Sequence, residues 1–244
     1  MRKNLLAAMT LALALPGAAL AQNAGTPAPA PQAAAKQPSV EQVVERMQAF
    51  YEKTRGFDTR FEQRFQQGGM PSRFAGSATT GRMRFRKPEG GTGPLMRWDY
   101  EDGRILLLVK DTSWTYDPDT KQATEYKVDA ANLSAAVTFM WGKGRLEDEF
   151  EIGAATRADL DKNGVALELT PKKAGQGFSR VFLVVDPASG AVRQSVVVQP
   201  NGSENRITFV EPKLDAEVRP GDFDPAKAFP AGTAIVKAAI PGQK

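Results

Sequence analysis

The side chains that most often carry out chemistry in proteins are largely missing from this sequence. Its 244 residues include no histidine and no cysteine, which removes the commonest general base, the commonest metal ligand and every thiolate or Ser–His nucleophile. Asp117 and Asp119 could form a two-carboxylate site, but they flank Pro118 between two predicted strands and are better interpreted as turn residues. No phosphate-binding loop or GxSxG motif occurs. The sequence therefore predicts no catalytic site, no metal site and no cofactor.

The chemistry that the sequence does offer is the binding of apolar groups. Met83 and Phe85 alternate with arginines, and the segment MRWDY at 96–100 alternates apolar with charged side chains. Period-two alternation is typical of strands with one buried and one solvent-exposed face. Short turns such as Asp102-Gly103 predict antiparallel neighbours. Because methionine and aromatic side chains adapt well to flexible ligands, the inner face of this predicted sheet is a candidate cavity for acyl chains.

The candidate cavity residues share a large apolar side chain at a predicted inward position. They are Phe61, Phe65, Met83, Phe85, Met96, Trp98, Leu107 and Trp114. The alternative interpretation is that the same side chains pack only with one another as an ordinary core. The pattern alone does not separate these two interpretations.

Two predicted helices could cover this face. Ser39 and Gln42 form a capping-box signature at the start of the first helix, residues 40–55. The second covers residues 130–141. Both have an apolar stripe at helical spacing, and the candidate lid residues on these stripes are Val43, Met47, Phe50, Leu133, Val137 and Met140. We expect the two helices to act as a lid that gates the cavity.

The rest of the chain is predicted to be mostly strand. One strand covers residues 57–66, and turn signals at 186–190 and 200–203 separate later strands. A sheet of this size twists and curls rather than staying flat. We therefore expect a mainly β fold, an incomplete (unclosed) antiparallel β-barrel of about eleven strands with helices forming a lid or plug over an apolar cavity.

The N-terminal residues have the pattern of an export signal. A basic start at Arg2-Lys3 precedes an apolar run, and Ala19-Leu20-Ala21 is an A-x-A cleavage site. We expect a cleaved signal peptide at 1–21, an Ala/Pro-rich disordered tether at 22–38, one folded domain at 39–236 and a tail at 237–244. Export of this kind predicts a periplasmic protein.

The order of these segments resembles that of the LolA family of periplasmic lipoprotein carriers. The matching segments are FDTRFEQRF, GRMRFRKP, MRWDY, LLLVKDTSWTYDPDTKQAT, LELTPKK and FPAGTAIV. They lie within residues 40–236, and RWDY followed by the LLV…W-Y-D-P hairpin is the most specific. The resemblance implies a carrier without enzymatic activity. Its cargo would be acylated lipoproteins, loaded from an inner-membrane ABC-type lipoprotein-releasing transporter and passed to an outer-membrane lipoprotein acceptor.

One departure from the family concerns the predicted lid. The family usually has Arg-Pro after the second strand, where the arginine helps to hold the lid closed, whereas this chain has Lys87-Pro88 preceded by Arg86. Lysine cannot reproduce the planar fork of a guanidinium group, so either Lys87 or Arg86 is expected to control the lid.

Other uses of the same predicted barrel remain open. It could be a periplasmic lipid or glycolipid carrier, or a scaffold that senses lipoproteins. The chain has no aromatic-plus-basic nucleic-acid motif, so no nucleic-acid partner is expected, and we expect a monomer.

Overall fold

A computed structural model describes residues 38–70, 76–87, 95–127, 145–173, 177–214 and 218–238. The chain divides into two compact units, Met1–Gln37 and Pro38–Lys244. The first unit lies entirely outside the described residues, so the predicted signal peptide and nearly all of the predicted tether do too. The predicted helix at 130–141 is also outside them. Everything that follows concerns the second unit.

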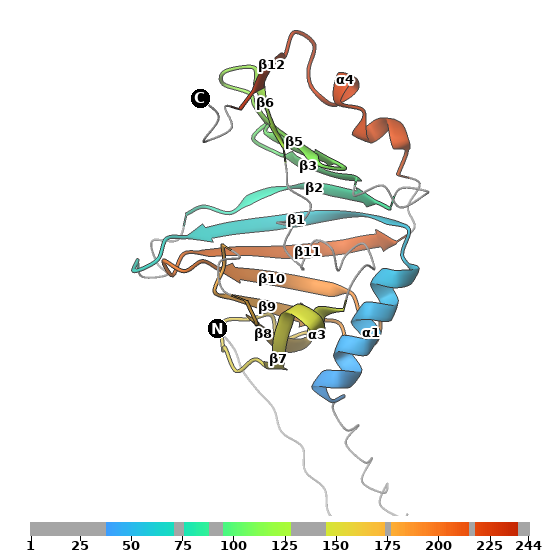
Figure 1. Ribbon diagram of the computed structural model, residues 1–244, viewed down its shortest axis with the longest axis vertical. Coiled ribbons are helices and arrows are strands. Elements are labelled where there is room, and N and C mark those ends of the chain that lie inside the picture. Colours follow the sequence, from blue (N-terminus) through green and yellow to red (C-terminus); the bar gives the residue numbers. More distant parts are fainter. Residues whose placement is uncertain are drawn as a thin grey trace, which may run out of the picture. The chain divides into compact units, whose positions relative to one another are not determined.

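The described residues form one twelve-stranded sheet (Figure 1). In their order across the sheet, the strands are β12 (Ala234–Lys237), β6 (Gln122–Lys127), β5 (Thr112–Asp117), β4 (Ile105–Val109), β3 (Leu95–Tyr100), β2 (Thr79–Arg86), β1 (Gly56–Gln66), β11 (Glu204–Leu214), β10 (Val192–Val198), β9 (Arg180–Val185), β8 (Val165–Pro171) and β7 (Phe150–Ala154). β12 and β7 are the two edges, so the sheet is not closed. The predicted mainly β, unclosed architecture is confirmed.

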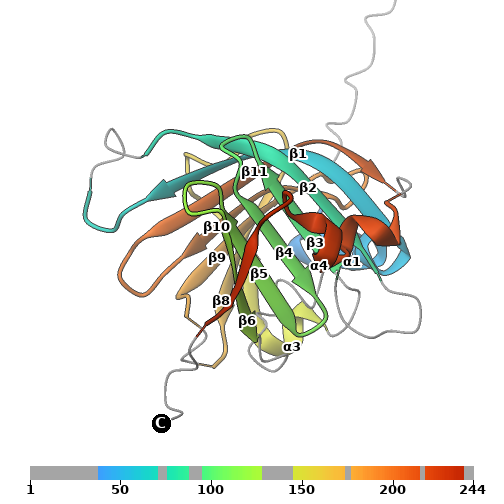
Figure 2. The same cartoon turned by 90° about the horizontal axis from the view of Figure 1, so that it is seen from above.

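The strand at the β12 edge departs from the antiparallel pattern. β12 pairs with β6 in parallel, whereas all other neighbouring strands are antiparallel. Parallel pairing requires a crossover rather than a tight turn. Here the chain crosses from β11 through two short helices, η3 (Pro220–Phe223) and α4 (Pro225–Ala228), as Figure 2 shows. The expected number of about eleven strands did not include β12.

The first predicted helix forms as α1 (Val40–Lys53), and its capping box is confirmed. The Gln42 backbone N–H donates to Ser39 Oγ at 3.3 Å, and the Ser39 N–H donates to Gln42 Oε1 at 3.0 Å. α1 crosses one end of the strands β9, β10, β11 and β1 (Figure 1). A further short helix, α3 (Leu146–Glu149), precedes β7.

The strand register places side chains on two faces of the sheet. We define the inner face as the one on which α1 packs, and its core contains Val43, Met47, Phe61 and Met83. The opposite, outer face is covered at β3–β5 by the C-terminal segment, which we define as residues 218–229. The two covers are separate in sequence and contact opposite sides of one sheet.

Candidate functional site

An aromatic cluster marks the inner face near the middle of β1. The Phe61 ring meets Trp98 edge-on, with ring centroids 4.7 Å apart, and Tyr100 in the same way at 5.2 Å. Phe209 on β11 lies 6.5 Å from Trp98. Gly81 makes room for this cluster, because a Cβ atom there would lie only 2.7 Å from the Phe61 ring and 2.3 Å from the Asp99 carbonyl oxygen.

Closer to α1, the inner face is more deeply buried. Phe57 and Phe85 stack at 5.2 Å, and Met96 lies beside them on β3, opposite Phe85 across the β2–β3 pair. Met83 and Phe85 are completely inaccessible to solvent. Of the predicted cavity residues, the structure brings five together on this face, and they are Phe61, Met83, Phe85, Met96 and Trp98.

Phe65 has the inward alternation of β1 but is not enclosed. Its side chain is 51% exposed, because the pairing of β1 with β2 ends at Gln63. Beyond that point β11 continues beside it, with Asn205 as the register partner of Phe65, and on the other side the Gly76 N–H donates to the Phe65 carbonyl at 3.3 Å. Phe65 therefore lies at the open end of the inner face.

The prediction that Leu107 and Trp114 share this face is wrong. Leu107 pairs with Arg97 on one side and Trp114 on the other, and both lie on the outer face with Val218 and Phe223 of the C-terminal segment. Every residue of β4 is apolar, so alternation could not indicate which ones point inward. The neighbouring residue Leu108 occupies the inner core instead.

The apolar stripe of α1 packs on the inner face as expected. Val43 and Met47 are fully buried, and Phe50 packs half-buried against the same core. The other three candidate lid residues, Leu133, Val137 and Met140, lie outside the described residues. The structure therefore describes one of the two predicted covering helices.

Lys87 and Arg86 point to opposite faces. Lys87 Nζ donates to the carbonyl oxygens of Tyr51 and Glu52 in the last turn of α1, at 3.2 Å for Glu52. Its backbone N–H also donates to the Arg55 carbonyl at 2.8 Å. Arg86 Nη1 donates instead to the Val218 carbonyl at 2.7 Å. Lysine at 87 thus caps α1, while Arg86 contacts the C-terminal segment.

A second set of contacts attaches α1 to the turn between β9 and β10. Arg46 Nη1 donates to the Pro187 carbonyl at 2.7 Å. Gly190 has φ +84°, and a Cβ atom there would lie 2.5 Å from the Arg46 carbonyl oxygen. Sequence analysis identified this segment only as a turn. Its position under α1 follows from the tertiary packing of distant residues, for which the sequence carries no local signal.

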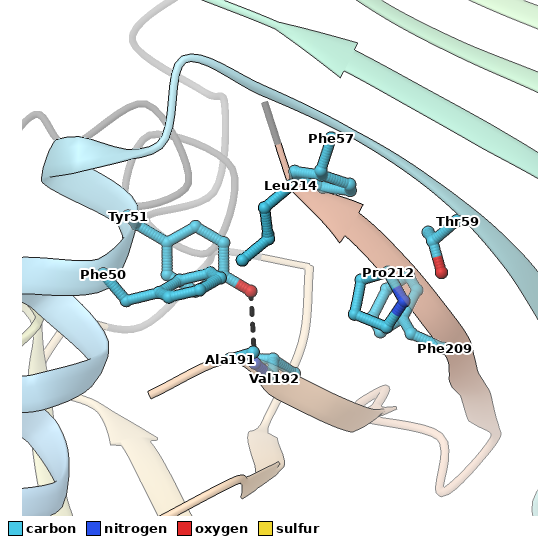
Figure 3. A pocket seen from close by; sticks show the side chains of 9 residues that line it. All are labelled: Phe50, Tyr51, Phe57, Thr59, Ala191, Val192, Phe209, Pro212 and Leu214. Carbon is cyan, nitrogen blue, oxygen red and sulfur yellow. Dashed lines mark hydrogen bonds between the residues drawn. The ribbon is translucent and has the colours of Figure 1, made fainter. Parts of the chain in front are cut away.

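Tyr51 connects α1 to the beginning of β10. Its hydroxyl accepts a hydrogen bond from the Val192 N–H at 3.3 Å (Figure 3). Burial raises the pKa of Tyr51 to about 12, although the hydrogen bond from Val192 acts in the opposite direction. The phenol is therefore neutral at any physiological pH.

A small apolar cavity remains beneath this end of α1. Figure 3 shows its lining, which is Phe50, Tyr51, Phe57, Thr59, Ala191, Val192, Phe209, Pro212 and Leu214. The cavity volume is about 20 Å³, which is room for about one water molecule. This volume is too small to hold an acyl chain.

The outer face has the charged groups that the inner face lacks. Arg84 Nη2 lies 2.5 Å from Asp99 Oδ2, and Arg97 Nη2 lies 2.8 Å from Asp99 Oδ1. Burial favours a raised pKa for Asp99, but the hydrogen bonds from Arg97 and Arg84 outweigh it and hold the pKa below its usual value. No group of three or more His, Cys, Asp or Glu side chains in the described ranges is placed to hold a metal ion.

In the described residues, an apolar sheet face is covered by the amphipathic helix α1, and sites for apolar ligands are lined mainly by side chains of this kind. The sequence model of the family described as "Outer membrane lipoprotein carrier protein LolA" matches residues 52–226. The chain belongs to this family, and the resemblance stated from the sequence is confirmed. The family consists of carrier proteins rather than enzymes, in agreement with the prediction of a non-enzymatic protein.

Curated relatives have the same description. An outer-membrane lipoprotein carrier protein of Nitrosospira multiformis is 32% identical over 114 residues, or 46% of this chain and 51% of the relative. One of Cupriavidus pinatubonensis is 30% identical over 140 residues, or 56% of this chain and 62% of the relative. The chain therefore matches about half to three fifths of the length of these relatives.

Among solved structures, a LolA superfamily protein from Nitrosomonas europaea aligns with 10% identity and a TM-score of 0.37, covering 77% of this chain and 98% of that one. An uncharacterized conserved protein from Thermus thermophilus aligns with 12% identity and a TM-score of 0.49, covering 81% and 98%. In the part of the chain that the structure describes, no helix has the length and apolar character needed to span a bilayer.

Proposed function

We propose that this protein is a periplasmic carrier that binds the acyl chains of lipoproteins on the inner face and moves them from the inner to the outer membrane. The observation that carries the proposal is that, among the described residues, the apolar inner face is covered by α1, which contacts the sheet mainly through apolar side chains. Membership of the LolA family supports the same function.

The energetics of α1 fit a cover that cargo can displace. Val43, Val44, Met47 and Tyr51 are buried between α1 and the sheet, and each stabilises the closed state by about 1.5–3 kcal/mol. An acyl chain that takes the place of α1 on the sheet supplies similar apolar contact. The closed and loaded states therefore differ little in buried apolar area, so cargo can be bound and later released.

The polar contacts of α1 set the balance between these states. Lys87 holds the last turn through backbone carbonyls, and Arg46 holds the middle of the helix in the same way. Hydrogen bonds that involve a charged donor contribute about 1.5–3 kcal/mol each. They can break without leaving a buried charge, because both side chains are long enough to reach solvent when the helix moves.

We also propose the partners that this function needs. Loading from an inner-membrane ABC-type transporter and delivery to an outer-membrane acceptor are supported by family membership alone.

The experiment that tests the function is displacement of an apolar fluorescent dye from the purified protein by a triacylated lipopeptide, with the non-acylated peptide as control. We expect displacement by the acylated form only. Trp98→Glu places a charge on the inner face and is expected to reduce capture by at least ten-fold while the protein stays folded. Ile235→Glu is the matched control, because Ile235 is 51% exposed on the edge strand β12. Equal displacement by both peptides, or normal capture by folded Trp98→Glu, would contradict the proposal.

A further inference from the structure

The inner face changes in character along β1, away from α1. Phe57 and Phe61 are almost completely buried, and both lie in the inner apolar core. Two residues further along, Gln63 is polar and only partly buried, and Phe65 at the end is 51% exposed. An amphiphile on this face therefore meets apolar side chains at one end and polar ones at the other.

An amide pair defines the polar end. Gln63 Nε2 on β1 donates to Asn205 Oδ1 on β11 at 2.9 Å. Within the described residues, this bond leaves Gln63 Oε1 and both Asn205 Nδ2 hydrogens without a protein partner. Each amide is therefore fixed in orientation by the other and still has capacity to bind a ligand.

Two more donors lie on the same face, nearer α1, because the register puts Tyr100 level with Phe61 and Trp98 level with Thr59. Trp98 Nε1 and the Tyr100 hydroxyl make no hydrogen bond to any described residue, although indole and phenol groups usually find a partner when they are buried. Both rings contact Phe61, at 4.7 and 5.2 Å between centroids. Phe61 is two positions from Gln63 on the inner side of β1. Neutral hydrogen-bonding groups therefore gather around one aromatic ring.

Charge indicates which head group suits this end of the face. The inner positions of β1, β2 and β3, and those of β11 from Asn205 to Phe209, carry no charged side chain. Arg104 stacks on the Tyr100 ring at 4.5 Å, but it is paired with Asp102 at 2.7 Å. Among the described residues, a phosphate group would find no unpaired cation there, whereas neutral carbonyl oxygens match the available donors.

We propose that Gln63 and Asn205, together with Tyr100 on the Phe61 ring, form a subsite for the ester and amide carbonyls that join acyl chains to a lipoprotein N-terminus, with the chains directed toward α1 and past Trp98. This inference rests on the proposed carrier function and adds the orientation of the cargo. The donors are partly shielded from water, so each hydrogen bond to the ligand replaces a weakened bond to solvent.

The test compares a triacylated lipopeptide with its ether analogue, in which the ester carbonyls are replaced by methylene groups. Wild-type protein is expected to bind the ester form roughly ten-fold more tightly, the effect of one or two net hydrogen bonds. In Gln63→Leu/Asn205→Leu this preference disappears, while affinity for the ether analogue is retained. Gln122→Leu, an exposed strand amide on β6, is the matched control and keeps the preference.

Each outcome is decisive. The same ester preference in the double variant and the wild type would overturn the subsite but leave the carrier function intact. Failure of the wild type to bind either lipopeptide would overturn both. Thermal unfolding of each variant shows that it is folded before its affinities are compared.

The orientation has its own readout in a Trp114→Phe/Trp141→Phe protein, where Trp98 is the remaining tryptophan. Because Trp98 lies on the α1 side of Gln63, bromine atoms midway along the acyl chains are expected to quench Trp98 fluorescence more than bromine atoms next to the carbonyls. The reverse order would mean that the chains point away from α1 and would overturn the proposed direction.

Discussion

The sheet has a cover on each face, and the two covers are held by different forces. On the inner face, α1 contributes an apolar stripe and a few hydrogen bonds to backbone carbonyls. On the outer face, the C-terminal segment combines a buried apolar cluster with charges, because Arg84 pairs with Asp222 at 3.5 Å and Arg97 donates to the Asp222 carbonyl at 3.1 Å.

This difference indicates which cover can move. Removing the C-terminal segment would leave Arg84 and Arg97, both mostly buried, with only Asp99 as a partner. Losing Asp222 as a partner for these two mostly buried arginines, and exposing the outer apolar cluster at the same time, would destabilise the protein. Removing α1 breaks a few hydrogen bonds and exposes apolar surface that acyl chains can cover. We therefore expect α1 to be the cover that moves and the C-terminal segment to stay in place.

The largest expected effect comes from the outer cover. Phe223 is 2% exposed and packs in the outer cluster, so Phe223→Ala is expected to lower the free energy of unfolding by about 3–5 kcal/mol. Denaturant unfolding measures this loss. Val236→Ala is the control, because Val236 is 42% exposed and its truncation costs little. A Phe223→Ala protein of wild-type stability would show that the outer cover does not support the fold.

Sequence reasoning was most successful where a pattern was local. The capping box and the stripe of α1, and the alternation of Met83 and Phe85 on β2, were predicted correctly because helix and strand periods are properties of neighbouring residues. The face on which Leu107 lies was predicted wrongly. A uniformly apolar strand has no alternation, so the face of each side chain depends on the register with neighbouring strands. The exposure of Phe65 depends on where a neighbouring strand ends.

Contacts between residues that are distant in the chain could not be predicted from the sequence either. Lys87 and Arg86 are adjacent, so the sequence could name both but could not say which one reaches α1. β12 is short and all four of its residues are exposed, and its parallel pairing follows from the path of the C-terminal segment. Gly190 packs closely against the backbone of α1 at Arg46, although the two residues are far apart in the chain.

High pH provides a way to destabilise the inner cover. Burial raises the pKa of Tyr51 from its ordinary value of 10.0 to about 12, so the neutral phenol stabilises the folded state fully below about pH 10. This contribution, about 2–3 kcal/mol, is lost as the pH rises through 12. We expect the unfolding free energy of the wild type to fall more steeply than that of Tyr51→Phe between pH 10 and 12. Identical pH profiles would mean that Tyr51 is solvated in the folded protein.

A smaller effect is expected from the hydrogen bonds at the end of α1. Lys87→Met removes the Nζ donor while keeping much of the side-chain volume, and it should lower the free energy of opening α1 by about 1.5–3 kcal/mol. Dye uptake should become faster, and amide exchange in the last turn of α1 should increase. Arg86→Met is the matched control, and its effect should be confined to the C-terminal segment. Increased exchange of α1 in both variants would show that the two covers are coupled.

The smallest effect concerns an exposed ion pair beside the outer face. A hydrogen bond from Arg157 lowers the pKa of Asp159 to about 2 from its ordinary 3.8. The stabilisation is therefore present above pH 3.8 and lost as the pH falls through 2. Because Asp159 is 54% exposed, solvent screening keeps the stabilisation from this ion pair below about 1 kcal/mol. Asp159→Asn should flatten the acid limb of the stability profile, and an unchanged acid limb would show that the pair contributes nothing.

Amide hydrogen exchange with and without a triacylated lipopeptide tests the central claim most directly. If cargo displaces α1, exchange in Val40–Lys53 and at Thr54 and Arg55 should increase when the lipopeptide binds, while exchange in the C-terminal segment stays unchanged. Unchanged or reduced exchange in α1 upon binding would contradict the account, because cargo would then occupy the protein without moving the helix that covers the inner face.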